Sequence, residues 1–358
     1  MDMNTRTSRR ALLGTTALAL TAWPASDGLA QSARSLFDGR RAMPEPAGAV
    51  AWLNSKPLRG MELRGKVVMV QFWTFTCVNW LRTLPYVNAW SAKYKDHGLV
   101  VIGVHTPEFS FEGDVANVRE ACGQLQIAYP VAVDSNQSIW KAFANSAWPA
   151  LYLADANGMI RYQHDGEGEY GRTEQRIQQL LAEAGAKDIP TGLARVTPSG
   201  VQAAADWATL QSPETYTGYQ KADRFRSPGG LSPDRSRTYE LPRRLASNDW
   251  AAKGEWTFAS EAARSEVAGA SIVYRFHARD VNMVMGAATR DRPVPFRVRI
   301  DGKAPGSAHG SDIDREGRGV IAEKRLYQLV RQAGAIDARA IEVEFMGGGA
   351  EVYAFTFG

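Results

Sequence analysis

One stretch of the chain, from Lys66 to Pro85, constrains the fold more than any other part. An apolar run from Lys66 to Trp73 follows Gly65 and is succeeded by polar residues, which predicts a buried strand. Cys77 comes four residues later, and the apolar residues after it repeat at helical spacing: Leu81, Leu84, Val87 and Trp90. The stretch therefore predicts a buried strand that leads into a helix, with a cysteine at the junction.

That junction gives Cys77 a chemical role. A cysteine at the start of a helix lies at the positive end of the helix dipole, where the thiolate is favoured over the thiol. The thiolate is the nucleophilic form of cysteine. The alternative is that Cys77 is a small buried hydrophobe, for which a strand-to-helix junction is a poor place. The position therefore favours a nucleophile.

The following residues alternate between apolar strands and amphipathic helices, which is typical of a sheet with helices on both faces. Asp155 to Gly158 predicts a hairpin turn, and Thr173 is expected to cap the last helix. The predicted order is β-α-β-α-β-α-β-β-α. After the first strand, the strands are expected at 99–104, 129–133, 148–153 and 159–164, and the middle helices at 113–126 and 136–143.

Residues 72–90 carry a family resemblance; they read FWTFTCVNWLRTLPYVNAW. This segment resembles the active-site segment of periplasmic thioredoxin-like proteins of the TlpA and DipZ type. The resemblance covers about Ala49 to Ala184 and implies a thioredoxin fold with an extra αβ insertion, together with thiol-based redox chemistry on protein thiols or disulfides. The family's second cysteine is missing, because position 80 is Trp.

The resemblance also implies a set of site residues around the attacking thiolate of Cys77. Thr76 and the amides of Val78 and Asn79 would surround the sulfur. Trp80, three residues after Cys77, would stand where a resolving cysteine waits, so two-cysteine exchange is excluded at this pair. Its ring is expected either to cover the sulfur, which would raise the thiol pKa, or to leave the neighbourhood open.

The second half of the predicted site lies further along the chain. The resemblance implies that Pro149, after Trp148, forms a cis peptide bond facing Cys77, where the backbone could pair with an extended partner. Glu108 follows the second buried strand and is a candidate proton acceptor, although a solvated loop acid is the commoner role. Cys122 could resolve a mixed disulfide, but its place on the apolar stripe of its helix favours a core role.

Three functional hypotheses remain open on these residues. Cys77 acts alone, with an external thiol as resolver, or it reduces peroxide, or the fold only binds partners. Thr74 and Cys77 match the Thr-x-x-Cys of peroxiredoxins, which can use one cysteine. The upstream proline of that family is absent, and its arginine over the sulfur could correspond to Arg82, Arg119 or Arg161.

The C-terminal part has a different sequence pattern. Residues 185–213 read as a linker with a helical turn around 201–210, and residues 214–358 contain many short alternating runs, among them 320–329, which predict an all-β sandwich or jelly roll. Through residues 279–282 (RDVN) and 353–358 (YAFTFG), this part resembles the C-terminal β-sandwich of DipZ-type proteins, which is similar to a carbohydrate-binding module. A possible glycan partner follows, with five candidate stacking residues, although such aromatics are mostly core: Tyr216, Tyr219, Tyr239, Trp250 and Trp256.

The N-terminus predicts export. Arg9 and Arg10 precede a modest apolar run, and residues 1–30 resemble a twin-arginine signal, with an ordinary secretory signal as the alternative. Residues 31–48 form a lead-in to the domain at 49–184. No spanning helix is expected in the mature protein. The net charge of +4 is too small and dispersed to favour nucleic acid. No metal-ligand spacing or phosphate loop appears, so neither a metal nor another cofactor is expected.

Overall fold

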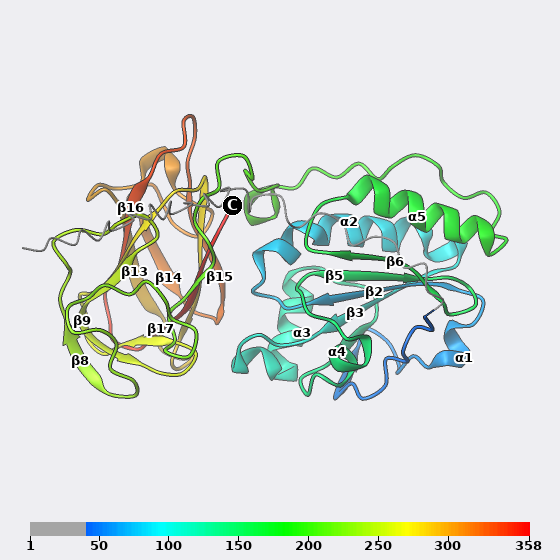
Figure 1. Cartoon of the computed structure of the whole chain (residues 1–358), viewed down its shortest axis with the longest axis horizontal. Helices are drawn as coiled ribbons and strands as arrows, with labels where there is room; N and C mark the ends of the chain where they lie inside the picture. The colour runs from blue at the N-terminus through cyan, green and yellow to red at the C-terminus, as the bar shows by residue number, and fades with distance from the viewer. Residues whose placement is uncertain (1–40) are drawn as a thin grey trace, which may run out of the picture. The chain divides into compact units, whose positions relative to one another are not determined.

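The computed structural model describes residues 41–358, and its first part is a six-stranded sheet with helices on both faces (Figure 1). The strand order is β1-β4-β3-β2-β5-β6. The elements are β1 (Ala51–Leu53), α1 (Gly60–Leu63), β2 (Val67–Trp73), α2 (Val78–Tyr94), β3 (Leu99–His105), α3 (Val115–Gln124), β4 (Val131–Val133), α4 (Ser138–Phe143), β5 (Ala150–Ala154), β6 (Ile160–Asp165) and α5 (Tyr170–Glu183).

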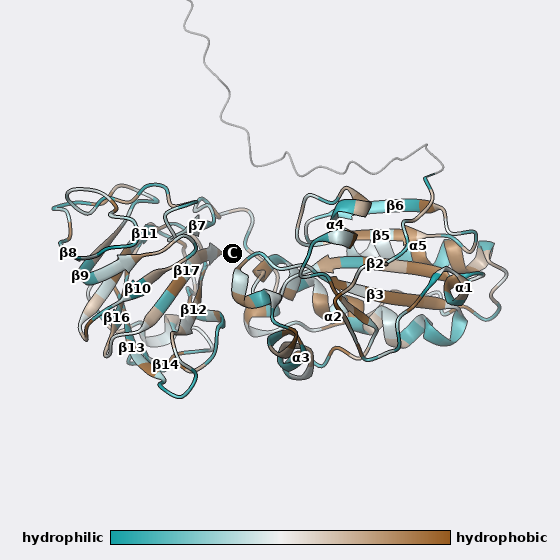
Figure 2. Cartoon of the chain, turned by 90° about the horizontal axis from the view of Figure 1, so that it is seen from below, coloured by the Kyte–Doolittle hydropathy of each residue, from teal (hydrophilic) through white to brown (hydrophobic). Residues whose placement is uncertain are grey.

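From β2 to α5 this order is the predicted β-α-β-α-β-α-β-β-α, so the predicted thioredoxin-like α/β fold is confirmed. β2 lies in the interior of the sheet, parallel to β3 and antiparallel to β5. All seven of its residues are buried, because helices cover both of its faces. Met69 and Trp73 pack in the cluster that includes α2 and α5, and Val70 and Phe72 pack in the cluster that includes α4. Figure 2 shows the apolar character of β2 and β3 in brown.

The second part contains strands only, apart from one short 3-10 turn, and confirms the predicted all-β domain. Its eleven strands form a curled antiparallel sheet with the main path β14-β13-β16-β11-β9-β10-β17-β12-β15. The strands are β7 (Thr215–Tyr216), β8 (Ser236–Tyr239), β9 (Trp250–Phe258), β10 (Ala263–Ser265), β11 (Ala270–Phe276), β12 (Asp280–Ala287), β13 (Val294–Ile300), β14 (Arg318–Ile321), β15 (Arg325–Arg331), β16 (Arg339–Phe345) and β17 (Ala350–Phe357).

Several predicted boundaries were wrong. Thr173 does not cap α5; Glu169 is the N-cap residue, and the Thr173 hydroxyl bonds to Tyr162 inside the core. The predicted helix at 113–126 is shorter, because a 3-10 turn at Ser110–Gly113 precedes α3. The predicted run at 320–329 is divided between β14 and β15, and only Gly200–Gln202 is helical in the predicted turn at 201–210. The spacing of apolar residues therefore predicted which helices and strands exist better than it predicted where each one begins and ends.

The predicted export signal at residues 1–30 and most of the lead-in lie outside the described residues. Within residues 41–358, no helix is long and apolar enough to cross a membrane.

Candidate active site

Cys77 lies where the sequence places it, at the junction of β2 and α2. It is the N-cap residue of α2: its carbonyl accepts from the Leu81 N–H at 3.0 Å, and its own N–H donates to Thr74 O at 3.2 Å. The side chain is half-buried, and its Sγ lies 3.8 Å from the carbonyl oxygen of Trp148. The structure therefore brings together Cys77 and the Trp148–Pro149 segment, which are 71 residues apart in the chain.

The surroundings of Cys77 shift the pKa of its thiol in opposite directions. Burial raises the pKa of the Cys77 thiol well above its ordinary value, and the negative charges of Glu214 and Glu108 add to the rise. The backbone N–H groups of Trp80 and Asn79 lower this pKa, as expected at a helix start. The start of α2 therefore acts in the direction that the sequence predicts, and burial acts against it.

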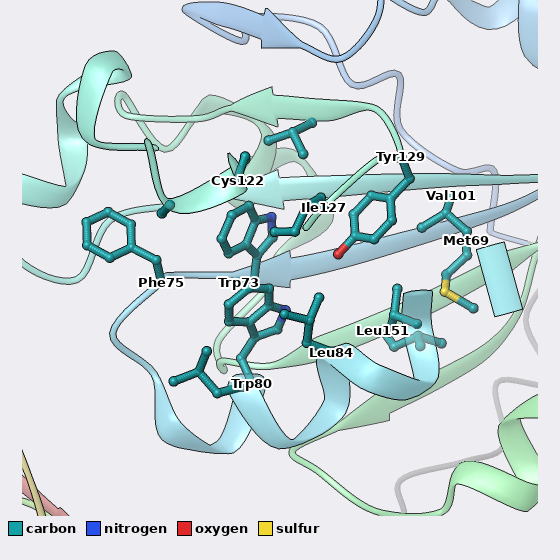
Figure 3. Packing of buried hydrophobic residues seen from close by; sticks show 14 of the residues in the cluster. Met69, Trp73, Phe75, Trp80, Leu84, Val101, Cys122, Ile127, Tyr129 and Leu151 are labelled. Atoms are coloured by element: carbon teal, nitrogen blue, oxygen red, sulfur yellow. The ribbon is translucent and has the colours of Figure 1, made fainter. Parts of the chain in front are cut away.

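Trp80 turns its ring into the core. The residue is fully buried, and its indole stacks on that of Trp73, with 4.2 Å between the ring centroids. Figure 3 shows the two indoles side by side in the core. The Trp80 Nε1–H donates to Gln71 Oε1 at 3.3 Å, and Gln71 Nε2 donates to the Thr83 hydroxyl at 2.9 Å. A neutral network therefore holds the indole against β2. The two predicted arrangements concerned the space around the Cys77 sulfur. In the structure the Trp80 ring packs on Trp73 as part of the core.

Sequence analysis missed Glu112, a buried carboxylate beside the cysteine loop. Its Oε1 accepts from the Thr76 hydroxyl at 2.6 Å and from the Thr76 N–H at 3.3 Å. Its Oε2 accepts from the N–H groups of Glu108 at 2.8 Å and Phe109 at 2.9 Å. The only signal in the sequence is an acidic residue directly after the apolar Phe109-Ser-Phe111 run, so its partner 36 residues away could not be foreseen.

The Trp148–Pro149 peptide bond is cis, as predicted. The Trp148 indole Nε1–H donates to Thr106 O at 3.1 Å, and its ring lies beside that of Trp140 with centroids 4.3 Å apart. Pro149 O accepts from the Gly166 N–H, which belongs to the segment after β6. Trp148 is thus fixed by its side chain while its carbonyl faces the Cys77 sulfur.

Glu108 is placed near the site but is engaged with the segment that enters the C-terminal domain. Its Oε1 accepts a hydrogen bond from the Tyr216 hydroxyl and pairs with Lys221 Nζ at 3.4 Å. The Tyr216 hydroxyl also lies 3.0 Å from a carboxylate oxygen of Glu214. Glu108 therefore contributes negative charge near Cys77, in a cluster that the sequence did not suggest.

The remaining predicted site residues have structural contacts of their own. Thr74 and Val78 are buried, and the Asn79 side chain accepts from Arg82 Nη1 at 3.4 Å. Cys122 is buried in the core cluster and is not bonded to Cys77, in keeping with the predicted core position.

Two of the three arginines considered for a peroxide site have carboxylate partners, whereas the third, Arg119, is exposed on α3. Arg82 pairs with Glu167 at 2.8 Å, with both side chains almost fully buried. Arg161 pairs with Asp155 at 3.0 Å and with Glu183 at 3.2 Å. Among residues 41–358, no group of three or more His, Cys, Asp or Glu side chains could hold a metal ion.

In the C-terminal domain, the candidate sugar-stacking residues are largely internal. Tyr239, Trp250 and Trp256 are buried in the core of the curled sheet. Tyr216 and Tyr219 are half-buried, and Tyr216 is hydrogen-bonded to carboxylates, as described above. Three of the five candidates are therefore core residues, which is the commoner role that the sequence analysis gave for such aromatics.

Comparison with known proteins agrees with this geometry. A family model described as Redoxin matches residues 44–181, and one described as Thioredoxin like C-terminal domain matches residues 212–358. The thiol-disulfide oxidoreductase YkuV of Bacillus subtilis is 33% identical over 144 residues, which cover 40% of this chain and 97% of YkuV. The chain belongs to the thioredoxin-like redoxin family. Its α/β domain is similar to that thiol-disulfide oxidoreductase over nearly the whole length of the relative.

The resemblance to DipZ extends this family membership into the second domain. Protein DipZ of Mycobacterium bovis is 39% identical over 266 residues, covering 73% of this chain and 36% of DipZ. The chain thus spans about a third of the length of this relative. A solution structure of a thioredoxin-like protein in the oxidized form shares 33% identity, covers 40% of this chain and 97% of its own, and has a TM-score of 0.38.

Proposed function

We propose that this redoxin-family chain carries out thiol–disulfide exchange with Cys77 as its single attacking thiol and an external thiol as resolver. The observation that supports this most is the environment of position 80. The Trp80 indole is part of the core and is hydrogen-bonded to Gln71, so no second thiol stands beside Cys77. Cys122, the other cysteine, lies in the core cluster as an unbonded thiol.

The proposed reaction has three balanced steps. The Cys77 thiol loses its proton, and the thiolate attacks one sulfur of a disulfide; the Cys77–sulfur bond forms as the disulfide breaks, and the other sulfur leaves as a thiolate. An external thiolate then attacks the mixed disulfide and releases Cys77 as a thiolate, which takes up a proton. The partner sulfur is then in a mixed disulfide with the external thiol. A second external thiolate attacks the external sulfur of that bond and releases the partner thiolate, so the partner disulfide is reduced to two thiols and two external thiols are oxidised to one disulfide.

The site offers two groups for this chemistry. The N–H groups of Asn79 and Trp80 at the start of α2 favour the thiolate that attack requires. The Trp148 carbonyl, held beside the sulfur through its own indole, can accept a backbone N–H of an extended partner. We therefore propose protein disulfides as partners, with Cys77 as the attacking thiol and the Trp148–Pro149 segment as the backbone that pairs with the partner.

We further propose that the protein works outside the cytoplasm. This rests on the arginine pair Arg9-Arg10 before an apolar run, and on the likeness to DipZ. The proposed domain division is 49–184 and 214–358, joined by 185–213. We favour disulfide exchange over peroxide reduction, because Arg82 and Arg161 are paired with carboxylates and Arg119 is exposed on α3, the helix that carries Cys122.

The test is the intact mass of the reduced full-length protein after brief exposure to oxidised glutathione. One glutathione adduct that maps to Cys77, forms in Cys122→Ser and is removed by a reducing thiol is the expected result. Absence of an adduct in wild-type protein, or its persistence in Cys77→Ser, would refute the proposal. Faster oxidation of Cys77 by peroxide than by the disulfide would instead support a peroxidase.

A further inference from the structure

Glu112 contacts the Cys77 loop in a way that its local structure does not require. The carboxylate closes the 3-10 turn at Ser110–Gly113, since its Oε2 accepts from the N–H groups of Glu108 and Phe109. That capping uses one oxygen. The other oxygen, Oε1, reaches across to Thr76, the residue directly before Cys77, and binds both its hydroxyl and its N–H.

A carboxylate in this position carries a free-energy cost. Glu112 is fully buried, and the described hydrogen-bond donors to it are neutral. Burial raises the pKa of Glu112, while the hydrogen bond from the Thr76 hydroxyl lowers it. Removal of a carboxylate from water is offset only when its oxygens are hydrogen-bonded. A turn that needed a cap alone could obtain one from an exposed side chain at less cost.

We propose that Glu112 is a positioning residue for Cys77, which fixes the preceding Thr76 so that the sulfur stays between the start of α2 and the Trp148 carbonyl. The inference rests on the proposed role of Cys77 as the attacking thiol. The relevant contact is the Oε1–Thr76 hydroxyl bond of 2.6 Å, because it joins the turn after β3 to the loop after β2. Attack on a disulfide requires the sulfur in a fixed direction, so a shift of the loop lowers the rate.

The test uses single variants and their combination. Thr76→Val removes the hydroxyl but keeps the branched shape, Thr76→Ser keeps the hydroxyl, and Glu112→Gln keeps the side-chain shape. Matched controls exist elsewhere in the domain. Thr173→Val removes another buried threonine hydroxyl, which bonds to Tyr162, and Glu174→Gln changes another buried carboxylate, which pairs with Lys93.

The readout is the rate at which Cys77 of the folded, full-length protein reacts with oxidised glutathione. We expect Glu112→Gln and Thr76→Val each to slow it by about fivefold or more, Thr76→Ser to restore it, and both controls to stay within about twofold. The double variant should be no slower than Glu112→Gln, because both changes break one contact. Multiplying effects, or equal effects in the controls, would overturn the inference.

A second measurement separates this inference from the proposed function and remains available if Glu112→Gln does not fold. Hydrogen exchange of the amides of Thr76 and Cys77 reports the loop directly, whether or not the thiol reacts. Exchange about tenfold faster in Thr76→Val than in wild-type protein supports positioning, and unchanged exchange overturns it. A wild-type Cys77 that is inert to glutathione would refute the proposed function alone.

Discussion

Replacement of Trp80 tests whether its indole is a core side chain or a cover over the Cys77 sulfur. Trp80→Ala removes a fully buried ring that stacks 4.2 Å from Trp73. Such truncations in cores cost about 3 to 5 kcal/mol, because burial is lost and a cavity remains. Loss of the Nε1–H donor to Gln71 adds about 1 kcal/mol. We expect Trp80→Ala to lower the free energy of unfolding of the α/β domain by about 4 kcal/mol or more.

Two further variants test where the stability lost in Trp80→Ala comes from. Trp80→Phe retains an aromatic ring over Trp73 but removes the hydrogen bond to Gln71, so we expect a loss of about 1 to 2 kcal/mol. Trp207→Ala is the control, because that ring is 55% exposed and its removal should change stability by less than about 0.5 kcal/mol.

The assay is urea unfolding followed by far-ultraviolet circular dichroism, with the alkylation rate of Cys77 measured on the same variants. Helical signal reports the α/β domain, because within residues 41–358 all the α-helices lie between Gly60 and Glu183. If the indole is core, Trp80→Phe leaves alkylation within about twofold of wild type. A stable Trp80→Phe whose Cys77 reacts more than about tenfold faster would show that the ring shields the sulfur, and the reasoning would be refuted.

Two other predictions concern buried charge. Burial lowers the pKa of His105 from 6.5 to about 3, so between these values the unfolded chain binds a proton that the folded chain excludes. We expect the free energy of unfolding, measured by urea titration, to fall by about 2 kcal/mol from about pH 7 to pH 5 because of this histidine, and His105→Phe to abolish that fall. An equal pH dependence in the variant would contradict the prediction. Arg82→Met leaves the buried Glu167 carboxylate unpaired, and we expect it to lower the free energy of unfolding by about 3 kcal/mol. The double variant Arg82→Met/Glu167→Met should regain part of that stability. If the effects of the two single changes simply add in the double variant, the pair is not coupled.

Much of the fold follows from local sequence pattern. The apolar run of β2 and the helical spacing after Cys77 determine the strand–helix junction, because a continuous apolar run can only be buried on both faces. The turn from Asp155 to Gly158 is equally local: Gly158 has φ of 76°, and its N–H donates to Asp155 O. The sequence also identified Cys77 and the cis peptide at Pro149, through resemblance to a family.

The chemistry of the site depended on contacts between distant segments. Burial has the largest effect on the pKa of the Cys77 thiol and raises it, and no spacing in the sequence measures that burial. The direction of the Trp80 ring depends on its stacking on Trp73 and its hydrogen bond to Gln71, two residues of the preceding strand β2. Glu112 acts on a residue 36 positions earlier. Hydrophobic periodicity specifies which residues are buried, but only the packed tertiary structure decides which buried groups meet.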